Sequence, residues 1–116
     1  MSWIIILLIA AVFVWRMKPA KGIRTMSAIE VKALTKEKSK QFIDVRTLGE
    51  YQSRHVKEFK NIPLNDLSKR LEELDKNKET YVICQSGMRS ARAAGILKRQ
   101  GFSDVINVKG GMSAWR

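Results

Sequence analysis

One stretch, residues 80–97, constrains the fold more than any other part of the chain. It places a short apolar run, a polar loop and a helical pattern in direct succession. The apolar run Tyr81-Val82-Ile83 is typical of a buried strand, and Gly101 ends the helix that follows. Other short segments with strand character alternate with helical patterns along the chain, at residues 23–26, 42–45 and 105–108. This alternation predicts an α/β fold in which helices flank a central parallel sheet.

Cys84 is the only cysteine, and it stands where the predicted central strand ends. The ligand site of a parallel sheet lies at that end of its strands. Gly87 allows the loop to turn several backbone N–H groups toward one point, and the following helix adds its positive end. Together with the charge of Arg89, these donors favour a thiolate at Cys84, although a free thiol has a pKa of about 8.5. The alternative is an inert core cysteine, but the polar loop favours a nucleophile.

The pattern Cys84-x-x-Gly87-x-Arg89-Ser90 resembles the active-site loop of rhodanese-domain sulfurtransferases, and the resemblance covers about residues 25–116. Four residues separate Cys84 from Arg89, as in sulfur-transferring rhodaneses, whereas the related phosphatases and arsenate reductases have five. The resemblance implies a bacterial-type single-domain sulfurtransferase with a three-layer rhodanese-like fold and a catalytic Cys84. The implied substrate-binding loop consists of Gln85, Ser86, Gly87, Met88, Arg89 and Ser90. We expect no cofactor and no metal.

A second part of the resemblance follows the strand at residues 42–45. Asp44 and Arg46, followed by Glu50, are similar to a rhodanese pattern whose charged residues brace the mouth of the active site. The resemblance implies supporting roles for these three residues. The plainer alternative is a surface ion pair between Arg46 and Glu50, worth less than about 1 kcal/mol. Farther along, Arg54 stands where the family has glycine, and we expect His55, the only histidine, to be structural rather than a proton donor.

Three local patterns predict how the rest of the domain folds. Ser27 and Glu30 form a capping box that opens a helix. This helix is expected to bury three apolar residues, Ile29, Ala33 and Leu34. A second helix, beginning near residue 65, is expected to pack on the core through Leu67, Leu71 and Leu74. The pair Gly110-Gly111 resembles the closing family signature, which implies a tight turn and a helical turn that places Trp115 on the core.

The N-terminal segment is an uninterrupted apolar run from Trp3 to Trp15, followed by basic residues. It could be a buried core helix, a cleaved signal peptide or a membrane anchor. The terminal position, the absence of basic residues before the run and the flanking tryptophans favour the anchor. We therefore predict a transmembrane anchor at residues 1–17, a linker at residues 18–24 and a rhodanese-like domain at residues 25–116. By the positive-inside rule, this single-pass protein of the cell membrane would have its domain facing the cytoplasm.

The chain has a formal net charge of +11, which raises the question of a nucleic-acid partner. The basic residues are scattered and are not interleaved with aromatic residues. We therefore expect no nucleic-acid partner, and we expect the charge to attract anionic substrates or an anionic membrane surface.

These observations predict a sulfurtransferase. It would move sulfane sulfur from thiosulfate or a persulfide donor to a thiol or cyanide acceptor through a Cys84 persulfide. Because the chain has no second cysteine, the acceptor must be external, either a small thiol or a protein. One alternative is a membrane-tethered, non-catalytic rhodanese-like module that binds or regulates a partner. Another is a phosphatase or arsenate reductase, which the four-residue spacing disfavours.

Overall fold

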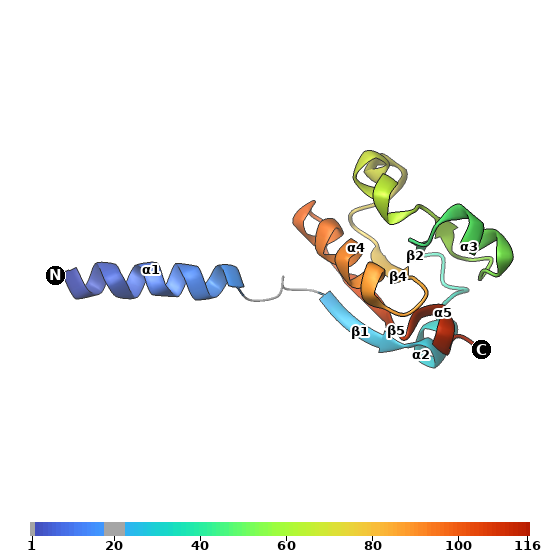
Figure 1. Ribbon diagram of the computed structural model, residues 1–116, viewed down its shortest axis with the longest axis horizontal. Coiled ribbons are helices and arrows are strands. Elements are labelled where there is room, and N and C mark those ends of the chain that lie inside the picture. Colours follow the sequence, from blue (N-terminus) through green and yellow to red (C-terminus); the bar gives the residue numbers. More distant parts are fainter. Residues whose placement is uncertain (1, 18–22) are drawn as a thin grey trace.

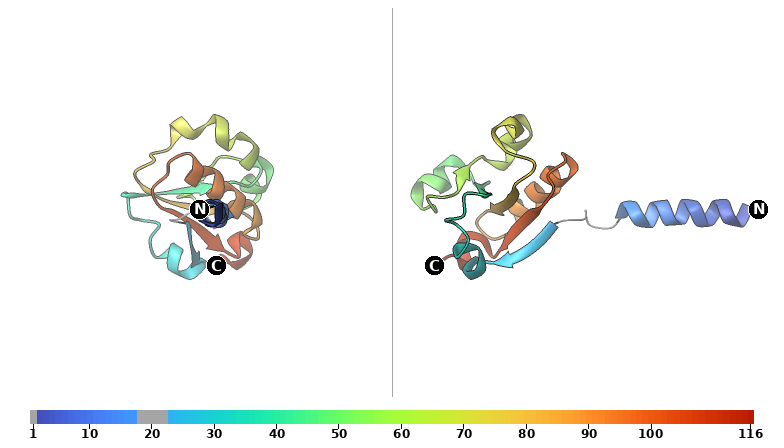
Figure 2. Two further views of the ribbon diagram at one scale, coloured as in Figure 1. Left: turned by 90° about the vertical axis from the view of Figure 1, so that its left-hand side faces the viewer. Right: turned by 180° about the vertical axis from the view of Figure 1, so that it is seen from behind.

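The computed structural model describes residues 2–17 and 23–116, with the side chains of residues 2–11 and 23–116. Its centre is a five-stranded sheet of order β1-β5-β4-β2-β3, in which all neighbouring strands are parallel. The strands are β1 (Ile23–Ser27), β2 (Lys40–Asp44), β3 (Lys60–Asn61), β4 (Glu79–Ile83) and β5 (Val105–Lys109). Helical segments lie on both sides of the sheet (Figure 1, Figure 2). The predicted α/β fold with a central parallel sheet is therefore confirmed.

The helical segments are mostly short. The α-helices are α1 (Ser2–Met17), α2 (Ala28–Lys32), α3 (Leu48–Ser53), α4 (Met88–Arg99) and α5 (Gly111–Ala114). Two 3₁₀-helices, η1 (Leu64–Lys69) and η2 (Leu71–Glu73), connect the edge of the sheet to β4. This order places β4 between β2 and β5, so that Cys84 leaves the middle of the sheet.

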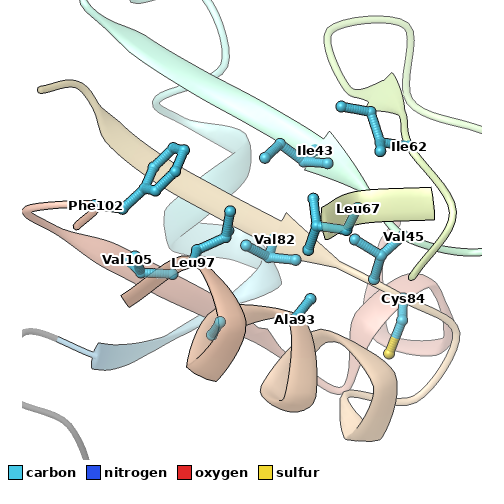
Figure 3. Close-up of a cluster of buried hydrophobic side chains, with 11 residues drawn as sticks. Ile43, Val45, Ile62, Leu67, Val82, Cys84, Ala93, Leu97, Phe102 and Val105 are labelled. Atoms are coloured by element: carbon cyan, nitrogen blue, oxygen red, sulfur yellow. The ribbon is translucent and has the colours of Figure 1, made fainter. Parts of the chain in front are cut away.

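The core consists of two apolar layers, because side chains alternate between the faces of each strand. On one face, Val82 of β4 belongs to a buried cluster with Ala93 and Leu97 of α4 and with Leu67 of η1. Figure 3 shows this cluster and places Cys84 at its end, where β4 meets the loop before α4.

On the other face, Tyr81 and Ile83 of β4 pack in a second cluster that includes residues of α2 and α5. Trp115 follows α5, is 8% exposed and packs edge-on against Phe59 with ring centroids 5.5 Å apart. The prediction that the closing turn places Trp115 on the core is confirmed.

The helix after β1 begins as predicted but buries a different face. Ser27 caps α2, and the capping box with Glu30 is formed. The buried residues are Ala28 and Val31, which lie three apart on the short helix and face the sheet. The predicted face is therefore wrong, since Ile29 and Ala33 are exposed and only Leu34 is partly buried.

The leucine-rich segment after β3 packs as predicted but is not an α-helix. It folds into η1 and η2, and no side chain caps η1 in the described structure, where Pro63 occupies the capping position. Leu67 is fully buried, and Leu71 and Leu74 pack against the same cluster. The predicted contribution of these leucines to the core is confirmed, whereas the predicted α-helix is wrong.

The membrane prediction for the N-terminal segment is wrong. Helix α1 has 16 residues, which at about 1.5 Å per residue gives about 24 Å, less than the roughly 30 Å of a bilayer core. Among the described residues, no helix has the length and apolar character needed to cross a membrane. This finding overturns the single-pass anchor and the orientation inferred from it. Most of the predicted linker, residues 18–22, lies outside the described residues.

Strand β2 ends in a buried ion pair that ties it to α3. Asp44 is 0% and Arg46 is 2% exposed, and their closest contact, between Nη2 and Oδ2, is 2.8 Å long. The Arg46 guanidinium also donates to the backbone oxygen of Glu50 at 3.3 Å and to that of Arg54 at 2.6 Å. The pair therefore joins the end of β2 to the chain on both sides of the end of α3.

We predict that Asp44→Asn strongly destabilises the domain, because it leaves the Arg46 charge buried without a counter-ion. Loss of one partner of a buried pair costs about 3–5 kcal/mol, which urea unfolding would measure. The matched control is Asp104→Asn, since Asp104 pairs with Arg24 at the surface, and such a pair contributes less than about 1 kcal/mol. Equal losses in the two variants would contradict the prediction.

Candidate active site

The site is built around the Cys84 sulfur, which the loop between β4 and α4 encloses. Cys84 is 1% exposed, and its Sγ accepts a hydrogen bond from the Gly87 N–H at 3.0 Å. The hydroxyl of Ser90, in the first turn of α4, lies 3.3 Å from the same sulfur. Gly87 caps α4 with φ 108°, a conformation that favours glycine and lets the loop turn back toward the sulfur. The loop thus forms a cradle of hydrogen-bond donors around the sulfur.

The cradle changes the acidity of the Cys84 thiol. Burial by itself raises the pKa of Cys84, because it disfavours the charged form. The Ser90 hydroxyl and the backbone N–H groups of Ser90, Gly87 and Ser86 outweigh burial, so that the pKa lies below its ordinary value. These donors are neutral, and they stabilise the thiolate through hydrogen bonds and aligned dipoles.

Arg89 closes the loop, but its charge is directed at Glu50. Its Nη1 and Nη2 atoms donate to the two Glu50 carboxylate oxygens at 2.7 and 2.9 Å. The hydrogen bonds from Arg89 lower the pKa of Glu50 to about 2. We expected its charge to help favour a thiolate at Cys84, whereas the structure pairs it with the Glu50 carboxylate of α3. The fork-to-fork pair therefore links the start of α4 to the start of α3.

The three supporting residues form two separate ion pairs. The expected alternative, a surface pair between Arg46 and Glu50, is not formed by their side chains. Arg46 pairs with the buried Asp44 carboxylate, and the Glu50 carboxylate pairs with Arg89. Both pairs act on α3, the first near its end and the second near its start.

The C-terminal segment supports the loop from outside. The Met112 N–H donates to the Cys84 carbonyl at 2.8 Å, and the Ser113 N–H donates to the Gln85 carbonyl at 3.0 Å. Gly111 makes this approach possible, since an added Cβ would lie 2.2 Å from the Cys84 oxygen. The closing double glycine therefore serves the site as well as the core.

Arg54 shows why this chain tolerates the loss of the family's glycine. Its backbone is extended, with φ −162°, a conformation open to any residue. Its guanidinium donates to the carbonyls of Met112 at 3.3 Å and Trp115 at 2.7 Å. The substitution thus adds a tie between the end of α3 and the segment that supports the loop.

His55 has contacts that fit the structural role we expected. Its ring stacks on Tyr51 with centroids 4.1 Å apart, and its Nδ1 lies 2.8 Å from the Tyr51 carbonyl oxygen. In the part of the chain that the structure describes, no group of three or more His, Cys, Asp and Glu side chains is arranged to hold a metal ion.

A surface hollow lies over the loop and the first turns of α4. Its volume is about 550 Å³, and it is lined by Ser86, Met88, Arg89, Ala91 and Arg92. The Met88 side chain is 77% exposed there. Arg92 was not among the predicted site residues, although its place three residues after Arg89 puts both on one helix face.

Sequence reasoning also missed Asn107 of β5. Its amide nitrogen donates to the Gly87 carbonyl at 3.3 Å, and its Oδ1 accepts from the Ser90 hydroxyl at 2.5 Å. The available signal was one polar residue within the apolar run at residues 105–108. Nothing in that run indicates which loop the side chain meets, because the contact depends on β5 lying beside β4.

Comparison with known proteins identifies relatives of this domain. The family model described as "Rhodanese-like domain" matches residues 27–116. YrkF of Bacillus subtilis, a candidate sulfur carrier protein, is 46% identical over 79 residues, which are 68% of this chain and 43% of that protein. Thiosulfate sulfurtransferase GlpE of Shewanella oneidensis is 31% identical over 90 residues, covering 78% of this chain and 89% of GlpE.

A solved structure has the same fold. The crystal structure of a rhodanese-like domain protein from Staphylococcus aureus superposes with a TM-score of 0.74 at 34% identity. The match covers 80% of this chain and 91% of the other.

We predict that Gly111→Ala disturbs the site, because the new Cβ would collide with the Cys84 carbonyl. The loop would shift away from α5, and Cys84 would lose donors and react more slowly with iodoacetamide at neutral pH. Gly49→Ala is the matched control, since nothing lies within 4 Å of an added Cβ there. Circular dichroism would establish that both variants are folded, and unchanged reactivity in folded Gly111→Ala would contradict the prediction.

We also predict that the Glu50–Arg89 pair loses its effect in acid. The folded-state pKa of Glu50 is lowered from 4.5 to about 2, so the pair adds stability above that ordinary value, and the contribution disappears as the pH falls toward 2. Because the two side chains are 34% and 36% exposed, we expect less than about 1 kcal/mol.

Urea unfolding of the wild type and Glu50→Gln tests this dependence. The difference in free energy of unfolding should be larger at pH 6 than at pH 2.5. Glu72→Gln, at an exposed position, is the control and should show no such trend. A difference between wild type and Glu50→Gln that is constant over this range would refute the assignment.

Proposed function

The chain belongs to the rhodanese-like domain family, and we propose that it is a sulfurtransferase in which Cys84 carries the transferred sulfur. The observation that carries the proposal is the enclosed Cys84 sulfur, which faces the Gly87 N–H and the Ser90 hydroxyl at 3.0 and 3.3 Å. A thiolate is the reactive form of cysteine, and these donors lower the pKa of Cys84. The donor would be thiosulfate or a persulfide, and the acceptor a thiol, a protein or cyanide.

The proposed reaction has two steps. In the first step, the Cys84 thiolate attacks the outer sulfur of the donor, a new S–S bond forms, and the donor's own bond to that sulfur breaks. Thiosulfate leaves as sulfite, and a persulfide leaves as a thiolate. In the second step, an external nucleophile attacks the outer sulfur of the Cys84 persulfide and restores the thiolate. Such covalent catalysis gives ping-pong kinetics.

The relatives support this choice of substrates. GlpE is named a thiosulfate sulfurtransferase, and YrkF a candidate sulfur carrier. The four-residue spacing between Cys84 and Arg89 fits a sulfur atom on the cysteine better than a tetrahedral oxyanion. For an anionic donor, we infer an approach over the hollow beside the loop, where Arg92 supplies positive charge and Met88 an apolar rim.

Intact mass spectrometry of the full chain tests the proposal. Incubation with thiosulfate, or with a small persulfide, should add about 32 Da to Cys84, and cyanide should remove it, as covalent sulfur transfer requires. The Cys84→Ser variant should gain nothing. The absence of this gain with every donor, while iodoacetamide still alkylates Cys84, would overturn the proposal and favour a binding module without turnover.

A further inference from the structure

We propose that Asn107 is a positioning residue that competes with the Cys84 sulfur for the proton of the Ser90 hydroxyl. Asn107 thereby limits how strongly the cradle stabilises the thiolate. The role of this competition in catalysis rests on the proposed sulfur transfer. The hydrogen bonds among Asn107, Ser90 and Cys84 do not depend on that proposal.

The orientation of the Asn107 amide follows from its neighbours. One end of the amide lies 3.3 Å from the Gly87 carbonyl oxygen, and the other lies 2.5 Å from the Ser90 oxygen. A carbonyl can only accept, so the NH₂ group must face Gly87. The reverse orientation would set two oxygens against each other with no proton between them. The Asn107 oxygen therefore faces Ser90.

The Ser90 hydroxyl has one proton and several acceptors around it. Its oxygen lies 2.5 Å from Asn107 Oδ1, 3.1 Å from the Gly87 carbonyl and 3.3 Å from Cys84 Sγ. An amide oxygen has no proton to give, so the short contact with Asn107 requires the Ser90 proton. While that bond is made, Ser90 offers only lone pairs to the sulfur. This arrangement suits a neutral thiol that donates its S–H to Ser90.

The thiolate reverses this preference. A charged sulfur needs a donor, and Ser90 can serve only by turning its proton away from Asn107. The hydrogen bond that Ser90 then donates to the sulfur is offset by the loss of the one that it donated to Asn107. Asn107 thus keeps the sulfur less strongly bonded, and a thiolate with a higher pKa is intrinsically the better nucleophile.

The competition between Asn107 and Cys84 for the Ser90 proton matters when the persulfide forms. When the thiolate attacks thiosulfate, its electron pair forms the new S–S bond, and sulfite leaves with the two electrons of the broken bond. The inner sulfur becomes neutral, and the outer sulfur carries the negative charge of the persulfide. The inner sulfur no longer needs the Ser90 proton, which returns to Asn107 without leaving the site. Asn107 therefore stabilises the states in which Sγ is neutral, including the persulfide.

The experiment measures the pH dependence of alkylation by iodoacetamide, which reports on Cys84 alone because the chain has one cysteine. Asn107→Leu should lower the pKa of Cys84 by about half to one pH unit, the equivalent of one hydrogen bond. Ser90→Ala should raise it. The decisive measurement uses the double variant that combines Asn107→Leu with Ser90→Ala. Its Cys84 should have the same pKa as in Ser90→Ala, because Asn107 affects the sulfur only by way of the Ser90 hydroxyl.

Two further variants serve as a control and as a substitute. Asn77→Leu makes the same chemical change at an exposed position and should leave the pKa of Cys84 at its wild-type value. Asn107→Ala removes the same acceptor with a smaller side chain and replaces Asn107→Leu should that variant not fold.

A purely structural role for Asn107 predicts the opposite sign. Loosening the Gly87 loop would remove donors from the sulfur and raise the pKa of Cys84. An unchanged or raised pKa in folded Asn107→Leu and Asn107→Ala, or a lowered pKa that persists without the Ser90 hydroxyl, would overturn the inference. Alkylation needs no sulfur donor, so this outcome is separate from the presence or absence of a persulfide in the mass experiment.

Discussion

The site depends on one constraint of the backbone. A loop can turn its N–H groups toward the Cys84 sulfur only if its carbonyl groups, which then point outward, find donors elsewhere. The C-terminal segment supplies them for Cys84 and Gln85 through the N–H groups of Met112 and Ser113. Asn107 supplies one for Gly87. Helix α5 and strand β5 therefore help determine the shape of the loop between β4 and α4.

The charged side chains at the site pair with one another, whereas the hydrogen-bond donors of the loop face the Cys84 sulfur. Asp44 is paired with Arg46, and Glu50 with Arg89, so each of these ion pairs is neutral as a whole. Their common effect is to fix α3 against the end of β2 and the start of α4. The sulfur itself faces neutral donors, whose dipoles can stabilise a thiolate without binding the anion as firmly as a free cation would. This balance suits a sulfur that must alternately carry and release charge.

Much of the site could be predicted because its residues are adjacent in the chain. The Cys84 loop is a continuous stretch, and its glycine and helix start are visible as a local pattern. The capping box at Ser27 and the closing turn before Trp115 are equally local. Where several packings satisfy one pattern, prediction failed: α2 buries Ala28 and Val31 instead of Ile29, and the segment after Pro63 forms 3₁₀-helices. The apolar run at the N-terminus suggested a membrane span, yet α1 is too short for one.

Local patterns in the chain predicted the alternation of strands and helices, the single cysteine at the end of the central strand, and the spacing of its loop. These follow from short-range rules of periodicity, capping and glycine conformation. The pairing of the charges and the hydrogen-bond partners of the Ser90 hydroxyl follow from the packing of the folded chain. Arg89 and Glu50 are 39 residues apart, and Ser90 and Asn107 are 17 apart, so their contacts exist only once strand order and helix packing bring them together. Hydrogen bonds and ion pairs depend on distances of about 3 Å, which local sequence patterns do not specify.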